Sequence, residues 1–444
     1  MESSKSQDIN LIKKLFKAKG NMNLLDNYRG QKVAEKPVLI EFIKFLLVVL
    51  FWIGTSFAAG SAFFVFVELI LSKILPSPII NVLRIFEPLL VILTFIPPNA
   101  MFLVLLERKL LALLTTRLGP NRVGPNGVFQ TFADALKLLF KEDIRPKDAD
   151  KVLFSLAPII FFAPSVIMLL PILSVIVSGA GLWGKLNIEF SLLFVIATSS
   201  IGIIGLILAG WASNNKYALL GSLRSVAQAI SYEIPLILSL VAFILISGNL
   251  NLKVISDGQS QNFLDWNILA GGALMADNIN WFVFPFQLIV FLGMAFMFYF
   301  CSLAEVNRIP FDLPEAESEL VSGYNTEYSG MKFALFFLAE YTNLFITSML
   351  FSILFLGSTH SGIFALDQFF ANTLKDTILG DLTWITNTFI ILTKAYLMVA
   401  LAIWIRATLP RFRSDQLMGL AWKVLIPISL FLILLAAICK TFTN

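Results

Sequence analysis

The sequence predicts an all-α polytopic membrane protein with about nine transmembrane helices. The chain of 444 residues is 57% hydrophobic and only 14% charged, a composition far outside the range of soluble domains. Its apolar residues also gather in runs of about 20, the helix length that crosses roughly 30 Å of hydrocarbon. An amphipathic helix and structured loops are expected on one side of the membrane, the cytoplasmic or mitochondrial-matrix side.

The apolar runs define the expected spans in chain order. They are 39–72, 86–106, 152–178, 192–212, 233–248, 281–303, 333–356, 383–405 and 421–440. The first run is too long for one upright helix, because at about 1.5 Å per residue it would reach roughly 50 Å. It is a tilted crossing, a crossing broken near Gly60 or a hairpin, and we favour a single crossing.

Basic residues gather in the loops on one side of the predicted bundle, here called side A. These loops are 107–151, 213–232, 304–332 and 406–423. The later loops and the terminus on the opposite side, side B, hold only Lys185, Lys253, Lys375 and Lys440. Because Lys and Arg accumulate in cytoplasmic and matrix loops, side A is the cytoplasm or the matrix. A single crossing at 39–72 also places the Lys-rich amino-terminal tail there.

Three regions are expected along the chain: a Lys-rich tail (1–38), an additional transmembrane segment with its linker (39–85), and a domain of eight transmembrane helices (86–444). In the tail, apolar residues share one helical face and lysines lie opposite. The apolar positions are Ile9, Ile12, Leu15 and Phe16. This pattern fits a helix on an anionic membrane surface and a solvated tail equally well.

Cofactor chemistry is limited by the scarcity of ligand side chains. Cys301 and Cys439 lie in separate apolar runs, and His360 is the single histidine. These residues cannot supply the ligands of a zinc, haem or iron–sulfur site. The sequence also has no phosphate-binding or dinucleotide-binding loop in a usable context. We therefore expect this chain alone to bind no cofactor and no nucleic acid.

The side A segment 107–147 contains two structural signals. Its GPNRVGPNG stretch has two Gly-Pro pairs, which exclude helix and favour a fixed turn. From Val128 to Phe140 the apolar residues recur at helical spacing with charged residues opposite, which predicts an amphipathic helix along the membrane face. The alternative is a surface helix that only caps the bundle.

Three ionisable residues fall within or at the rim of predicted spans. Glu233 begins one span beside Pro235, Glu340 lies about two turns into another, and Lys394 is near the middle of a third. Charged groups in the membrane are costly, so they indicate function by default. A Glu340–Lys394 pair that only locks helices together is the alternative, and the sequence leaves it open.

The stretch AEVNRIPFDLPEAESELVSGYNTEYSG carries six carboxylates directly after an apolar run. Asp312, Pro314 and Glu315 match a helix start, with a capping carboxylate and a first-turn proline. Closely spaced carboxylates share protons, which a proton relay requires. A solvated acidic loop is the alternative interpretation.

Five long strings resemble, in order and spacing, subunit 1 (the H-type membrane subunit) of proton-pumping NADH:quinone oxidoreductase, respiratory complex I. They are ERKLLALLTTRLGPNRVGPNG, FADALKLLFKEDIRP, GWASNNKYALLGSLRSVAQAISYE, AEVNRIPFDLPEAESELVSGYNTEYSGMKFALFFLAEYTN and WIRATLPRFRSDQLMGLAWKVLIP. The resemblance runs from about residue 86 to residue 440, and residues 1–85 depart from the family pattern.

The resemblance implies a protein that forms part of a quinone chamber and couples quinone reduction to proton translocation. The implied quinone-binding residues are Glu107, Arg108, Arg117, Asp134, Phe337 and Arg406. The implied proton path is Tyr232, Glu233, Glu305, Asp312, Glu315, Glu317, Glu319, Glu327 and Glu340.

The resemblance also implies partners and a location. Iron–sulfur clusters, FMN and the residues that reduce the quinone headgroup belong to partner subunits, so the isolated chain is expected to be inactive. The expected partners are the peripheral quinone-module subunits, neighbouring membrane-arm subunits, ubiquinone or menaquinone, and membrane lipid. The membrane is the bacterial cytoplasmic membrane or the mitochondrial inner membrane.

Two other functions are alternatives to a complex I subunit. The first is the equivalent component of a membrane-bound hydrogenase, which is disfavoured because several strings follow the quinone-enzyme pattern. The second is a stand-alone ion or solute transporter, which often has an internal repeat that this sequence lacks.

Overall fold

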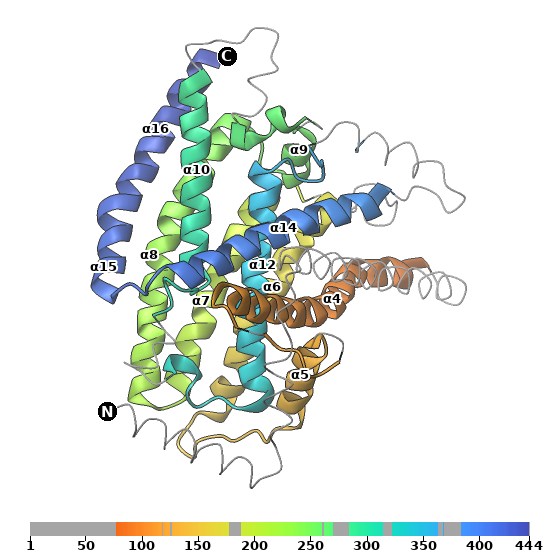
Figure 1. Ribbon diagram of the computed structural model, residues 1–444, viewed down its shortest axis with the longest axis vertical. Helices are drawn as coiled ribbons and strands as arrows, with labels where there is room; N and C mark the ends of the chain where they lie inside the picture. The colour runs from red at the N-terminus through yellow and green to blue at the C-terminus, as the bar shows by residue number, and fades with distance from the viewer. Residues whose placement is uncertain are drawn as a thin grey trace, which may run out of the picture. The chain divides into compact units, whose positions relative to one another are not determined.

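The computed structural model describes residues 77–117, 119–124, 127–176, 188–259, 262–269, 284–313, 322–362, 367 and 383–443. All regular secondary structure in these residues is helical (Figure 1). In this described part of the chain, eight helices are long and apolar enough to cross a membrane. The predicted all-α polytopic class is therefore confirmed. The tail (1–38) and the expected span at 39–72 lie outside the described residues.

The long helices follow the predicted order. They are α4 (Ser77–Leu114), α6 (Lys151–Ile176), α7 (Ser191–Ala212), α8 (Lys216–Ser247), α10 (Phe284–Glu305), α12 (Gly330–Phe355), α14 (Thr383–Thr408) and α16 (Ile426–Thr443). The last is continuous with α15 (Ser414–Leu420) through a π-helical turn, η5 (Ala421–Leu425). Shorter helices are α5 (Gln130–Phe140), α9 (Leu252–Asp257), η2 (Phe263–Asp265), η3 (Asn267–Leu269) and η4 (Gly323–Asn325).

Helix α8 corrects one sequence expectation. The hydropathy pattern predicts a loop at 213–232, but α8 begins at Lys216 and continues to Ser247. Its start is capped by Asn215, whose side chain accepts a hydrogen bond from the Tyr217 backbone at 3.0 Å. The segment mixes polar and apolar helix formers, so a search for uniformly apolar runs misses it. Glu233 consequently lies in the interior of α8 and not at the mouth of a span.

Aromatic packing holds α6 to the side A segment that precedes α12. The Phe154 ring of α6 stacks on Tyr328 with centroids 4.1 Å apart, and Phe336 of α12 meets Tyr328 edge-on at 5.0 Å. All three rings are buried together in one core cluster. This cluster fixes the segment that carries Tyr324 and Glu327 against the bundle.

The predicted amphipathic helix is present as α5, which packs against α4 and α12. Phe132, Leu139 and Phe140 remain exposed in the described part of the chain. The turn before it depends on Gly127, whose φ is +72° and whose added Cβ would lie 2.2 Å from the Pro120 carbonyl oxygen. Contact between the exposed face of α5 and lipid stays a prediction.

Candidate functional site

A buried carboxylate on α4 is bound by side chains from three other segments. Glu107 is 6% exposed. Its Oε2 accepts from Arg308 Nη1 at 3.2 Å and from the Tyr341 hydroxyl at 2.8 Å, and its Oε1 accepts from Arg406. The Arg308 guanidinium also lies 4.0 Å from the centroid of the Tyr341 ring. We call these four residues the Glu107 cluster.

The Glu107 cluster has one carboxylate and two guanidiniums, so it carries a net positive charge. A buried charge is tolerated only when it is paired and hydrogen-bonded, and each oxygen of Glu107 has such a partner. Helices α4, α12 and α14, together with the segment after α10, bring these groups together. Glu107 and Arg406 were predicted from the sequence, whereas Arg308 and Tyr341 were missed.

The other predicted quinone-binding residues lie outside this cluster. Arg108 Nη1 donates to Asp134 Oδ2 at 2.6 Å, with both side chains partly exposed. Arg117 is exposed, and Phe337 is half-buried with its ring 4.7 Å from the Phe333 ring. Successive helical residues point about 100° apart, so Glu107 faces inward while Arg108 faces the surface helix α5.

The segment that follows α10 is fixed against α8 and against the segment between α14 and α15. Gln228 Nε2 of α8 donates to the carbonyls of Ala304 and Phe311 at 2.8 and 2.7 Å. Asp312, which is 6% exposed, accepts from Arg411 Nη2 at 3.1 Å. Asp312 is thus part of an ion pair on side A. The predicted helix start at Pro314 and Glu315, with Glu317 and Glu319, lies outside the described residues.

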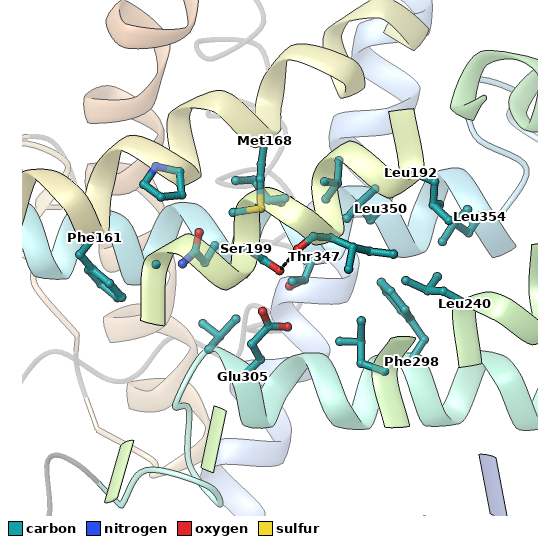
Figure 2. A pocket seen from close by; sticks show the side chains of 18 residues that line it. Phe161, Met168, Leu192, Ser199, Leu240, Phe298, Glu305, Thr347, Leu350 and Leu354 are labelled. Carbon is teal, nitrogen blue, oxygen red and sulfur yellow. Dashed lines mark hydrogen bonds between the residues drawn. The ribbon is translucent and has the colours of Figure 1, made fainter. Parts of the chain in front are cut away.

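Three predicted carboxylates gather around the packed faces of α7, α8, α10 and α12. Glu305 lines a cavity of about 70 Å³ together with Ser199 and Asn343 (Figure 2). An adjoining cavity of about 40 Å³ is lined by Glu305, Asn343 and Glu340. Glu233 accepts a hydrogen bond from Ser200, the residue next to Ser199. We call Glu233, Glu305 and Glu340 the carboxylate cluster.

The two adjoining cavities have room and partners for water. One buried water needs roughly 10–15 Å³, so both spaces can hold more than one. The side-chain oxygens of Asn307 and Asn343 are buried without a hydrogen-bond partner among the described residues. Buried acceptors of this kind are normally satisfied by protein or water. Water at these positions would link Glu305 to Glu340.

Other predicted members of the proton path lie apart from the cavities. The Tyr232 hydroxyl is directed to α15, where it donates to the Leu417 carbonyl at 3.0 Å. Glu327 accepts from Asn215 Nδ2 at 2.8 Å, at the side A end of α8. Glu340 accepts from the Tyr324 hydroxyl at 2.7 Å. Tyr324 was missed by sequence reasoning, although it lies within the acidic stretch.

Lys394 does not pair with Glu340. Its ammonium donates to the carbonyls of Leu356, Ser358 and His360, and it lies 4.2 Å from the centroid of the Trp266 ring. Glu340 precedes Leu356 on α12 by a separation of about 24 Å along the helix axis. The alternative of a Glu340–Lys394 lock is therefore wrong, and Lys394 instead holds the side B end of α12.

Metal-ligating side chains do not gather in the described residues: no three of His, Cys, Asp and Glu come together there in a way that could hold an ion.

Comparisons with known proteins cover most of the chain. The family model described as NADH dehydrogenase matches residues 87–437. The chain is 44% identical over 345 residues to the H-type subunit of the NADH-quinone oxidoreductase of Brevibacillus brevis, covering 77% of this chain and 89% of the relative. Its identity to the protein of the same name from Geobacillus thermodenitrificans is 44%, with 80% and 92% covered. The protein of the same name from Rickettsia prowazekii is 42% identical, and the match covers 77% of this chain and 89% of the relative.

Proposed function

This chain belongs to the NADH dehydrogenase family, and from that premise we propose that it forms part of a quinone-binding chamber and couples quinone reduction to proton translocation. It is a multi-pass membrane subunit of an NADH-quinone oxidoreductase and assembles with the other subunits of that complex. The hydrogenase and transporter alternatives gain no support from these relatives.

One observation carries the proposal. Arg308 binds Glu107, and Glu305, only three residues earlier, lines the cavity of the carboxylate cluster. The segment between them is anchored by Gln228 at Ala304 and Phe311. A change of charge at the Glu107 cluster can therefore act on the carboxylate cluster through a short, anchored piece of backbone.

The Glu107 cluster suits the quinone end of this coupling. A quinone that receives electrons gains negative charge before it is protonated, and fixed cations stabilise that charge. Arg308 and Arg406 supply two such cations against one carboxylate. The cluster would stabilise the reduced headgroup or tune its approach. Arg108 with Asp134, and Phe337, would line the outer part of the same route.

The carboxylate cluster suits the proton end. Glu305 and Glu340 share a cavity that can hold water, and Glu233 accepts a hydrogen bond from Ser200, the neighbour of the cavity-lining Ser199. Carboxylates that share a hydrated cavity can exchange protons when a nearby charge appears or disappears. Glu327 and Asp312 would continue the path toward side A, and Glu315, Glu317 and Glu319 stay in the proposal on sequence grounds.

The remaining parts of the reaction would come from partners. Electrons would arrive from iron–sulfur clusters and FMN held by other subunits, and this chain would bind no cofactor alone. The substrate is ubiquinone or menaquinone, and the membrane is a bacterial cytoplasmic or mitochondrial inner membrane. The exposed apolar side chains of α5 and the long helices would contact lipid or neighbouring subunits.

The proposal is tested in the intact complex with Glu233→Gln and Glu340→Gln. Each variant should lower NADH:quinone reduction while leaving NADH oxidation by an artificial acceptor unchanged, because that acceptor does not need the membrane arm. Glu189→Gln is the matched control, since Glu189 is an exposed carboxylate outside both clusters. Wild-type quinone reduction and proton pumping in both cluster variants would exclude the relay.

A further inference from the structure

The larger cavity changes character along its length. Ser199, Glu305 and Thr347 form a polar part, whereas the side chains labelled toward the other end are apolar (Figure 2). The apolar end is formed by Leu192, Leu240, Leu350 and Leu354. The polar part of the cavity suits water, whereas the apolar part next to it disfavours water.

The apolar end of this cavity faces side B. Leu192 is the second residue of α7 and Leu354 the last but one of α12, and both helix ends lead into side B segments. Ser199 and Leu192 are separated by two turns of α7, about 10 Å along the axis. Thr347 and Leu354 repeat that spacing on α12. An apolar section of the cavity about 10 Å long, here called the dry section, thus separates the hydroxyl groups that line the cavity from side B.

Helix α9 covers this end of the bundle. It packs against α6 and α12, and its Leu252 and Ile255 are buried. The Leu252 backbone donates to Ser191 Oγ at 2.7 Å, and Ser256 Oγ donates to Ser358 Oγ at 2.7 Å. Helix α9 is therefore bonded to the start of α7 and to the segment after α12, the two helix ends that border the dry section.

The end of α12 is held by two further side chains. Gln259 Nε2 donates to the Ile353 carbonyl at 2.8 Å, and Gln259 Oε1 accepts from the Gly357 backbone at 2.9 Å. The Lys394 ammonium binds the carbonyls of the next turn, from Leu356 to His360. An amide and a cation thus satisfy carbonyls that a helix end leaves without partners.

We propose that the dry section and α9 together form a proton barrier between the carboxylate cluster and side B. Narrow apolar constrictions lose their water, and a proton needs a continuous chain of water or polar groups to pass. Protons held near Glu305 would then leave only toward side A or toward neighbouring subunits. This inference rests on the proposed function, because a barrier matters where its polar end carries protons.

The barrier is tested by placing a polar side chain in it. Leu192→Asn, in the intact complex in proteoliposomes, should raise passive proton entry several-fold when a potassium gradient with valinomycin drives it without NADH. Leu193→Asn is the matched control, because Leu193 is the next residue of α7 and is 55% exposed. The control should keep wild-type proton permeability. An assembled Leu192→Asn complex with wild-type permeability would overturn the barrier.

A second variant guards against failed assembly. Leu240→Thr puts a hydroxyl at the same end with a smaller change in polarity, and it carries the same expectation. Assembly is checked by NADH oxidation with an artificial acceptor per complex. The two variants distinguish failure of the barrier from failure of the relay. Wild-type turnover in Glu305→Gln together with increased proton permeability in Leu192→Asn would contradict only the relay. Reduced turnover in Glu305→Gln together with wild-type permeability in Leu192→Asn would contradict only the barrier.

Discussion

Arg308 Nη1 lies 3.2 Å from Glu107 Oε2, although Glu107 belongs to α4 and Arg308 follows α10, about 200 residues later in the chain. The pair joins α4 to the segment that leaves α10, and Glu305, the last residue of α10, lines the cavity of the carboxylate cluster. The two candidate sites are therefore neighbours through a few residues of backbone. Substitutions at the residues around these sites therefore have distinct expected effects on quinone reduction and on stability.

Tyr341→Phe removes one hydrogen bond from Glu107 and keeps the ring beneath the Arg308 guanidinium. A hydrogen bond to a charged group contributes about 1.5–3 kcal/mol, so the carboxylate should become less well held. We expect quinone-dependent turnover to fall several-fold, with acceptor-dependent NADH oxidation unchanged. Tyr217→Phe is the control, since Tyr217 is 60% exposed. Equal quinone kinetics in both variants would argue against a role for the Glu107 cluster.

Lys394→Met leaves the carbonyls at the end of α12 without their cation. Each buried acceptor left unsatisfied costs about 1–3 kcal/mol, so thermal stability of the complex should fall. Lys253→Met, on the same side and half-buried, should have little effect. Complex that does assemble with Lys394→Met should retain its ratio of acceptor-dependent to quinone-dependent activity, because Lys394 lies away from both clusters. A selective loss of quinone reduction would contradict this assignment.

Gly127→Ala tests the turn before α5. A side chain at φ +72° is strained, and its Cβ would clash with the Pro120 carbonyl. We expect a loss of stability of about 1–2 kcal/mol or more, measured as a lower melting temperature of the complex. Gly419→Ala should be neutral or slightly stabilising, because Gly419 is helical and has open space around its Cβ position. The reverse order of stability would show that the turn is not fixed.

His360 gives the side B segment a pH dependence. Burial lowers the pKa of His360. The carboxylates of Asp367 and Asp257 act in the opposite direction and raise this pKa, whereas the nearby Lys394 lowers it further. The unfolded chain then binds a proton that the folded chain does not, so stability is present above the unfolded pKa near 6.5 and falls as the pH drops below it. His360→Gln should flatten the change in melting temperature between about pH 7.5 and 5.5. An unaltered slope would contradict the assignment.

The sequence predicts the two candidate sites better than their connection. Glu107 and Arg406 are recognisable from long motifs, and Glu233, Glu305 and Glu340 from carboxylates beside apolar runs. Arg308 and Tyr341 are not, because nothing in local spacing tells that residues on three separate segments will meet.

The missed boundary of α8 has a related cause. A hydropathy search finds helix that is surrounded by lipid, whereas the first half of α8 carries polar side chains and is packed partly against protein. For Lys394 the sequence suggests the wrong partner. A lysine in an apolar run suggests a carboxylate partner, but backbone carbonyls at a helix end can bind its ammonium equally well.

The carboxylate cluster is proposed to couple quinone reduction to proton movement, and Glu305→Gln in the intact complex tests this coupling most directly. The measurements are the rates of quinone reduction and of proton translocation in proteoliposomes, each per assembled complex, with acceptor-dependent NADH oxidation as the measure of assembled enzyme. We expect quinone reduction and proton translocation to fall together while acceptor-dependent oxidation is unchanged. Wild-type rates of both in the Glu305→Gln complex would contradict the coupling.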